Sequence, residues 1–137
     1  MYGANGVYSS GVLTAINGKA LKTVTVSIDV ASGNAGLFNY LNGANIEYIG
    51  VGGQILNTTG SDYAGGIVGL IGGTTAIRNC KSTANVILAT FDSANNATAK
   101  NGAGGIIGYV QSGANITVET CTYAGGSNYV ARNVDGN

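Results

Sequence analysis

The sequence contains no histidine, no proline and no tryptophan, and it has only two cysteines, Cys80 and Cys121. A zinc site draws its ligands from histidine, cysteine and acidic side chains, usually about four of them. Without histidine and with only two thiols, the chain has no ligand set for such a site. We therefore expect no metal and no cofactor.

Charge is scarce as well. Charged residues make up 9% of the chain, against roughly 25% in average soluble domains. Six acidic and six basic residues cancel, so there is no basic field of the kind that attracts nucleic acid or an anionic membrane. We expect no nucleic-acid partner, and a surface built from Asn, Thr, Ser and Gly.

Long apolar runs are also missing. The longest one near the middle, residues 64–71, is far shorter than the roughly 20 residues that span a bilayer, so we expect no membrane insertion. The first residues, MYGANGVYSS, lack the cationic and apolar segments of a signal peptide. We interpret the chain as one whose leader has been removed, or as a piece of a longer protein.

The chain does contain many glycines and small apolar residues. It is 45% hydrophobic with 24 glycines, and it is rich in Ile, Val and Leu, which disordered chains avoid. These features predict a folded chain. Its length suits one domain, residues 1–137, with a single continuous core.

A pattern of one glycine, two apolar residues, two variable residues and a third apolar residue occurs four times. Its copies begin at Gly11, Gly36, Gly66 and Gly105, which are 25, 30 and 39 residues apart. A second apolar pattern follows each copy and advances almost in step, beginning at Leu21, Ile46, Ile77 and Val118. Two patterns that advance together predict a repeat architecture, with repeats at approximately 11–35, 36–64, 65–103 and 104–130.

The patterns have the period of strands. Val24, Val26 and Ile28 alternate with polar residues, and no stretch keeps a helical period with caps. Because such short strands cannot bury an apolar face alone, the repeats must stack and share a core. The sequence predicts an all-β fold, a right-handed parallel β-helix (β-solenoid) of about four rungs. Handedness rests on the general preference for right-handed crossovers and on the resemblance described next.

Two stretches resemble a known repeat. YAGGIVGLIGGTTAIRNCKSTANV, from Tyr63, and GAGGIIGYVQSGANITVETCTY, from Gly102, are similar to the GLUG-type repeats of large bacterial cell-surface proteins and adhesins. In the first two repeats the resemblance is weaker, because the doubled glycine and the cysteine are missing. The resemblance implies a parallel β-helix, an extracellular or cell-surface location and a stalk or adhesive role, and it implies no catalytic residues.

Equivalent residues of stacked repeats should form ladders that point into the core, with successive residues of one ladder about 4.8 Å apart. The alignment predicts three of them: Val12, Leu37, Ile67 and Ile106; Ile16, Leu41, Ile71 and Val110; and Val24, Ile49, Cys80 and Cys121. Cys80 and Cys121 then become neighbours. Their expected separation is slightly long for a disulfide, which favours two buried free thiols over a bridge.

One predicted ladder carries charges of alternating sign, namely Lys22, Glu47, Arg78 and Glu119. Like charges directly opposite each other destabilise a sheet, so the alternation favours a role in fixing the register. A catalytic role is the weaker interpretation, since Arg78 separates Glu47 from Glu119 by two rungs and the four Asp residues fall in different loops. Carboxylate chemistry of the glycosidase kind needs the two groups close together.

Another predicted ladder is apolar and points outward. If Ile67 and its equivalents face the core, their neighbours form an exposed stripe, which would contain Leu13, Phe38, Tyr40, Val68, Leu70, Ile107 and Tyr109. One interpretation is a strand buried on both faces under the long loops. The other is an interface with another chain, since contiguous exposed apolar patches mark interaction sites.

For function, the sequence predicts a non-catalytic, extracellular structural or adhesive segment of a bacterial surface protein. The first alternative is a subunit of an extracellular fibre, stacked end to end or laterally, because a short solenoid has two open ends. The second is a β-helix that binds or degrades carbohydrate. Its partners would be copies of itself or flanking repeats, or a glycan or protein of a host or surface.

Overall fold

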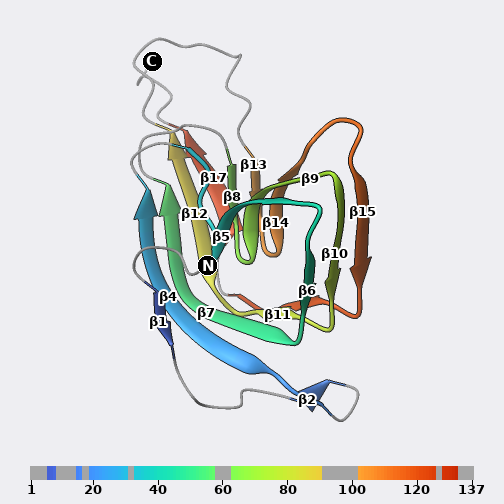
Figure 1. Ribbon diagram of the computed structural model, residues 1–137. Helices are drawn as coiled ribbons and strands as arrows, with labels where there is room; N and C mark the ends of the chain where they lie inside the picture. The colour runs from blue at the N-terminus through green and yellow to red at the C-terminus, as the bar shows by residue number, and fades with distance from the viewer. Residues whose placement is uncertain are drawn as a thin grey trace.

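The computed structural model describes residues 6–8, 15–16, 19–30, 33–57, 63–90, 102–125 and 128–132. Every regular element in these ranges is a β-strand (Figure 1). The strands are β1 (Gly6–Tyr8), β2 (Ala15–Ile16), β3 (Lys19–Ala20), β4 (Lys22–Val30), β5 (Phe38–Asn42), β6 (Asn45–Glu47), β7 (Ile49–Asn57), β8 (Tyr63–Gly65), β9 (Val68–Gly72), β10 (Thr74–Arg78), β11 (Lys81–Ser82), β12 (Asn85–Thr90), β13 (Gly102–Gly104), β14 (Ile107–Val110), β15 (Asn115–Glu119), β16 (Thr122–Tyr123) and β17 (Asn128–Arg132).

The strands recur in the same order and stack as parallel layers. We call residues 35–57 layer 2, residues 63–90 layer 3 and residues 102–132 layer 4; β4 stacks on layer 2 from the other side. Parallel pairing gives the strand orders β5–β9–β14, β6–β10–β15 and β7–β11–β16, and it joins β8 to β13. Strand β12 pairs in parallel with both β7 and β17. The all-β prediction is confirmed for the described residues, and their stacked parallel sheets fit a β-helix.

Antiparallel pairing occurs only near the start of the described chain. Strand β1 pairs with the outer edge of β4, and β2 pairs with β3 as a small hairpin. The long parallel pair of β4 with β7 joins this region to layer 2. The N-terminal region therefore adds strands over β7.

The predicted inward ladders are in register in layers 2 to 4. Ile71 pairs with Leu41 on one side and Val110 on the other. The pairing of Lys81 with Gly50 and with Thr122 likewise aligns the preceding residues of the ladder, Ile49, Cys80 and Cys121.

In the first repeat the predicted register is wrong by two residues. Val24 pairs with Val51, where we expected Ile49, and Ile16 pairs with Lys19 within the small hairpin rather than extending the ladder of Leu41. Val12 lies outside the described residues. A shift of two keeps every apolar side chain of β4 on the core side, so alternation alone could not choose between the two registers.

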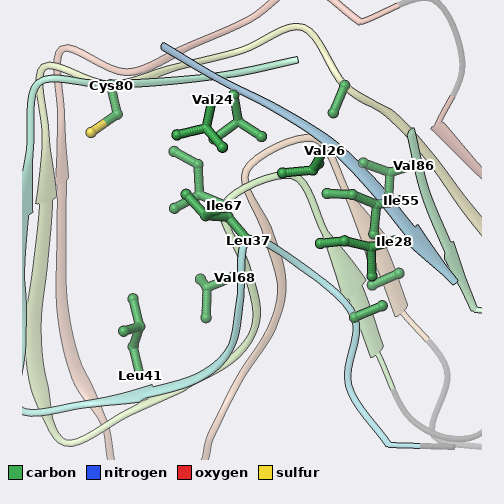
Figure 2. Packing of buried hydrophobic residues seen from close by; sticks show 14 of the residues in the cluster. Val24, Val26, Ile28, Leu37, Leu41, Ile55, Ile67, Val68, Cys80 and Val86 are labelled. Atoms are coloured by element: carbon green, nitrogen blue, oxygen red, sulfur yellow. The ribbon is translucent and has the colours of Figure 1, made fainter. Parts of the chain in front are cut away.

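The core fills both sides of a turn that enters the interior. Figure 1 shows the turn between β8 and β9 lying between β12 and β10. In Figure 2, Cys80, Ile67, Val68 and Leu41 lie within one bend of the ribbon, while Ile55 and its neighbours form a separate column. All of these side chains belong to one buried cluster.

Glycine makes this inner turn possible. We define the inner turn as residues 65–68 in layer 3 and 104–107 in layer 4. A Cβ on Gly65 would collide with the carbonyl oxygen of Val68 and with the backbone of Gly108, and a Cβ on Gly104 would collide with the carbonyl oxygen of Ile107. The first glycine of each doubled pair is therefore explained by backbone packed directly against backbone.

Candidate functional site

The predicted apolar stripe divides into a buried part and an exposed part. Val68 is fully buried in the core, and Phe38 and Ile107 are half-buried against it. Val68 is not part of an exposed stripe, because the inner turn carries this residue into the interior where both of its flanks are covered; at this position the interpretation of burial on both faces fits and the interpretation of an exposed interface does not. Leu13 lies outside the described residues.

Tyr40, Leu70 and Tyr109 form the exposed part, which we call the tyrosine stripe. They are paired in register across layers 2, 3 and 4. Tyr40 is 42% exposed and Tyr109 is 44% exposed, while Leu70 between them is half-buried. A line of rings on parallel strands offers flat apolar faces with polar edges, which suits contact with a sugar ring or with another protein.

Neighbouring side chains hold the tyrosine stripe in place. The Tyr40 hydroxyl donates to Gln111 Oε1 at 3.1 Å, across the position of Gly72. The ring of Tyr109 stacks on that of Tyr63, with the centroids 4.2 Å apart and 10° between the planes. Both tyrosines of the stripe are thus fixed by contacts between different layers.

The charged ladder is in register across layers 2 to 4. Arg78 pairs with Glu47 of β6 on one side and Glu119 of β15 on the other. Arg78 Nε donates to Glu119 Oε2 at 2.7 Å, and the two side chains are 34% and 59% exposed. At that exposure the ion pair contributes about 0.2–1 kcal/mol, so its main effect is on the choice of neighbour.

Lys22 does not belong to this ladder. It pairs with Ile49, two residues beyond Glu47, as part of the shifted register of β4. The prediction that Lys22 lies opposite Glu47 is therefore wrong. Among the described strands, none pairs with β6 on the side away from β10.

Cys80 and Cys121 are free thiols in adjacent layers. Cys80 is fully buried, and its thiol donates to the carbonyl oxygen of Arg78 at 3.1 Å. Burial raises the pKa of Cys80 to about 11, so the thiol stays protonated at neutral pH and behaves as a small apolar side chain. Cys121 is partly exposed and donates to the carbonyl oxygen of Glu119 at 3.3 Å.

Layer 4 leaves equivalent apolar positions open. Val118 and Val110 are 48% and 45% exposed, whereas Ile77 and Ile71, which occupy the same ladders in layer 3, are completely buried. Within the described chain, no strand pairs with β13, β14, β15 or β16 on the side away from layer 3. We call this side of layer 4 the open edge.

Sequence reasoning missed two polar features that join the layers. The hydroxyl of Thr75 donates to the carbonyl oxygen of Gly72 at 2.7 Å and accepts from the amides of Gly43 and Ala44 at 2.9 and 3.3 Å. The other feature is the column of Tyr48, Asn79 and Thr120, which all have positive φ, at 56°, 52° and 51°. Only Asn79 is a residue type that favours this conformation, so residue types alone do not predict the column.

The described residues contain no group of three or more cysteine or acidic side chains that could hold a metal ion. Within the same part of the chain no helix is long and apolar enough to cross a membrane.

In comparisons with known proteins, no family model, no curated protein and no solved structure matches this chain.

Proposed function

We propose that this chain is a segment of a right-handed parallel β-solenoid that acts outside the cell or at its surface as a structural or adhesive element, without catalysis. The observation that carries the proposal is the repeated parallel, in-register stacking of layers 2, 3 and 4 around one apolar core. Stacking of this kind builds a rigid body by adding equivalent layers. It needs no ligand and no reactive group.

The distribution of carboxylates supports a non-catalytic role. Glu47 and Glu119 lie two layers apart with Arg78 between them, and Arg78 forms an ion pair with Glu119. Two carboxylates that act on one glycosidic bond flank that bond with the sugar between them, whereas here Arg78 occupies the layer between Glu47 and Glu119. The charged ladder instead suits the choice of register.

The tyrosine stripe is the surface through which we expect an adhesive contact. Tyr40 and Tyr109 are exposed, aligned and held by neighbouring side chains, so little side-chain entropy is lost when a ligand stacks on them. A pyranose ring or an apolar protein surface fits a platform of this kind. A glycan or a protein could therefore bind at the tyrosine stripe without any catalytic group there.

Hydrodynamics and binding test the proposal together. Size-exclusion chromatography with light scattering, followed by negative-stain microscopy, should detect compact monomers. Filaments would favour the fibre alternative.

On a glycan panel, Tyr40→Ala with Tyr109→Ala should abolish any binding that the parent shows, while the exposed Glu119→Gln change should leave it intact. Hydrolysis of a panel glycan by the parent would contradict the non-catalytic assignment.

A further inference from the structure

The open edge of layer 4 has the composition of an interlayer contact. Val118 and Val110 continue ladders that are fully buried one layer earlier, and Ile106, Ile107 and Ile116 pack against the core but stay partly exposed. On this side, alternate backbone groups of β15 have no partner strand among the described residues, because the backbone groups of successive residues in a parallel strand face opposite neighbours. Apolar side chains and strand edges therefore occur on the same surface.

We propose that the open edge binds one further parallel layer of the same repeat type, and that this layer carries Lys or Arg in register with Glu119. The inference rests on the proposed function, since it takes the chain to be a stacking segment. To that function it adds the charge of the next layer. This layer would carry a basic residue at the ladder position where layers 2 and 4 of this chain carry Glu47 and Glu119.

The charged ladder supplies the reason for a basic residue. Arg78 has a carboxylate on each side, Glu47 and Glu119. Glu119 meets Arg78 on one side and remains 59% exposed. A basic residue on the other side would repeat the arrangement around Arg78, whereas an acidic one would place like charges directly opposite each other, which destabilises a sheet.

Charge makes a second copy of this chain a poor occupant. Strands β6 and β15 pair with the two edges of β10 in the same register. A copy that stacked its layer 2 on layer 4 would therefore place its Glu47 directly opposite Glu119. That contact would be repulsive at the centre of the new ladder.

Shape points the same way. Strand β4 lies on the outer edge of β7, and β1 lies on β4, while in the described residues nothing pairs with the outer edges of β5 and β6. The N-terminal end thus has a step over β7. Suppose that β6 of a second copy paired with β15 of the first. The β4 strand of the second copy would then lie in the same level as β16 and β17 of the first and would collide with them, so the two ends are not complementary.

The experiment appends a copy of residues 63–90 after Asn137. Residues 133–137 then connect β17 to the added β8, as residues 58–62 connect β7 to β8, so both connections have five residues. The added Arg78 should lie opposite Glu119. We expect a higher urea midpoint than that of the parent chain, and slower hydrogen exchange at the amide of Val118, which the new layer would cover.

A matched control replaces the added arginine. Arg78→Glu in the appended copy should raise the unfolding equilibrium constant roughly fivefold relative to the arginine version. The difference should disappear when the original Glu119 is changed to Gln, and it should shrink in about 1 M salt.

The outcomes separate the two proposals. If neither extended chain gains stability or Val118 protection, stacking at the open edge is wrong and the proposed function fails with it. If both extensions stabilise equally, layers stack but the requirement for a basic residue is wrong. If the parent alone forms dimers or filaments that Glu119→Gln strengthens or leaves unchanged, the occupant is a second copy, which also overturns the inference.

Discussion

Layers 3 and 4 share nearly the same sequence around the inner turn and have very different environments there. The inner turn with one residue on each side reads Ala-Gly-Gly-Ile-Val-Gly from Ala64 and Ala-Gly-Gly-Ile-Ile-Gly from Ala103. Ile67 is completely buried, while its equivalent Ile106 is only partly buried. Layer 3 has a neighbour on both sides, and layer 4 has one in the described structure. Burial in this fold is therefore set by the neighbouring layers as much as by the sequence of a layer.

The largest predicted effect compares two isoleucines. Ile67→Ala should lower the free energy of unfolding by about 3–4 kcal/mol, because it leaves a cavity among residues that cannot all move in. Ile106→Ala should lower it by about 1–2 kcal/mol, because that side chain already contacts solvent. Urea denaturation of both variants measures the difference. Equal losses would contradict the dependence of burial on neighbouring layers.

The glycines of the inner turn should behave in the opposite way, with equal losses in both layers. Gly65→Ala and Gly104→Ala each place a Cβ against a carbonyl oxygen of the same turn, that of Val68 and that of Ile107. We expect each to cost about 3 kcal/mol through forced backbone movement. Thermal unfolding checks this, with Gly52→Ala as control because its Cβ would meet only the Thr83 hydroxyl, at 3.1 Å. A much smaller loss for Gly104 would mean that the turn depends on stacking.

Thr75 ties layer 2 to layer 3 and has no counterpart in layer 4, where Ile116 holds its place. Thr75→Val should cost about 2 kcal/mol, because the amides of Gly43 and Ala44 lose their acceptor in a partly buried site. Thr75→Ser keeps the hydroxyl and should lose less than half as much. Hydrogen exchange at the Gly43 amide provides a local measurement, and unchanged protection in the valine variant would argue against this role.

The smallest effect concerns the positive-φ column, and it is a gain. Thr120 in layer 4 has φ 51° where layer 3 has Asn79 at 52°. A β-branched residue is strained in that region, and asparagine tolerates it. Thr120→Asn should raise the free energy of unfolding by about 0.5–1 kcal/mol, and Asn79→Thr should lower it by a similar amount. A pair of urea titrations measures both changes, which should have opposite signs.

The sequence predicted most of the stacking, because glycine and apolar spacing together align repeats 2 to 4. The ladders of Leu41, Ile71 and Val110 and of Glu47, Arg78 and Glu119 follow from that alignment. In the first repeat, the apolar pattern that begins at Leu21 placed Lys22 and Val24 two residues away from their observed register. Alternation cannot distinguish registers that differ by two residues.

The candidate surface was harder to predict. Simple alternation puts Val68 and Leu70 on one face, but the inner turn buries Val68 and leaves Leu70 half-buried beside the exposed Tyr40 and Tyr109. The stacking of Tyr63 on Tyr109 joins β8 of one layer to β14 of the next. Such a contact depends on how the turn folds back between layers, which no periodicity records.

Hydrogen exchange at two equivalent amides tests the account most directly. The backbone amides of Asn79 and Asn115 donate to the carbonyl oxygens of Glu119 and Gly73, so by alternation the amide of Ile77 faces layer 4 and that of Val118 faces the open edge. We predict that Ile77 exchanges near the rate set by global unfolding and that Val118 exchanges at least about 100-fold faster. Equal protection of the two amides would contradict the claim that each layer owes its burial to its neighbours.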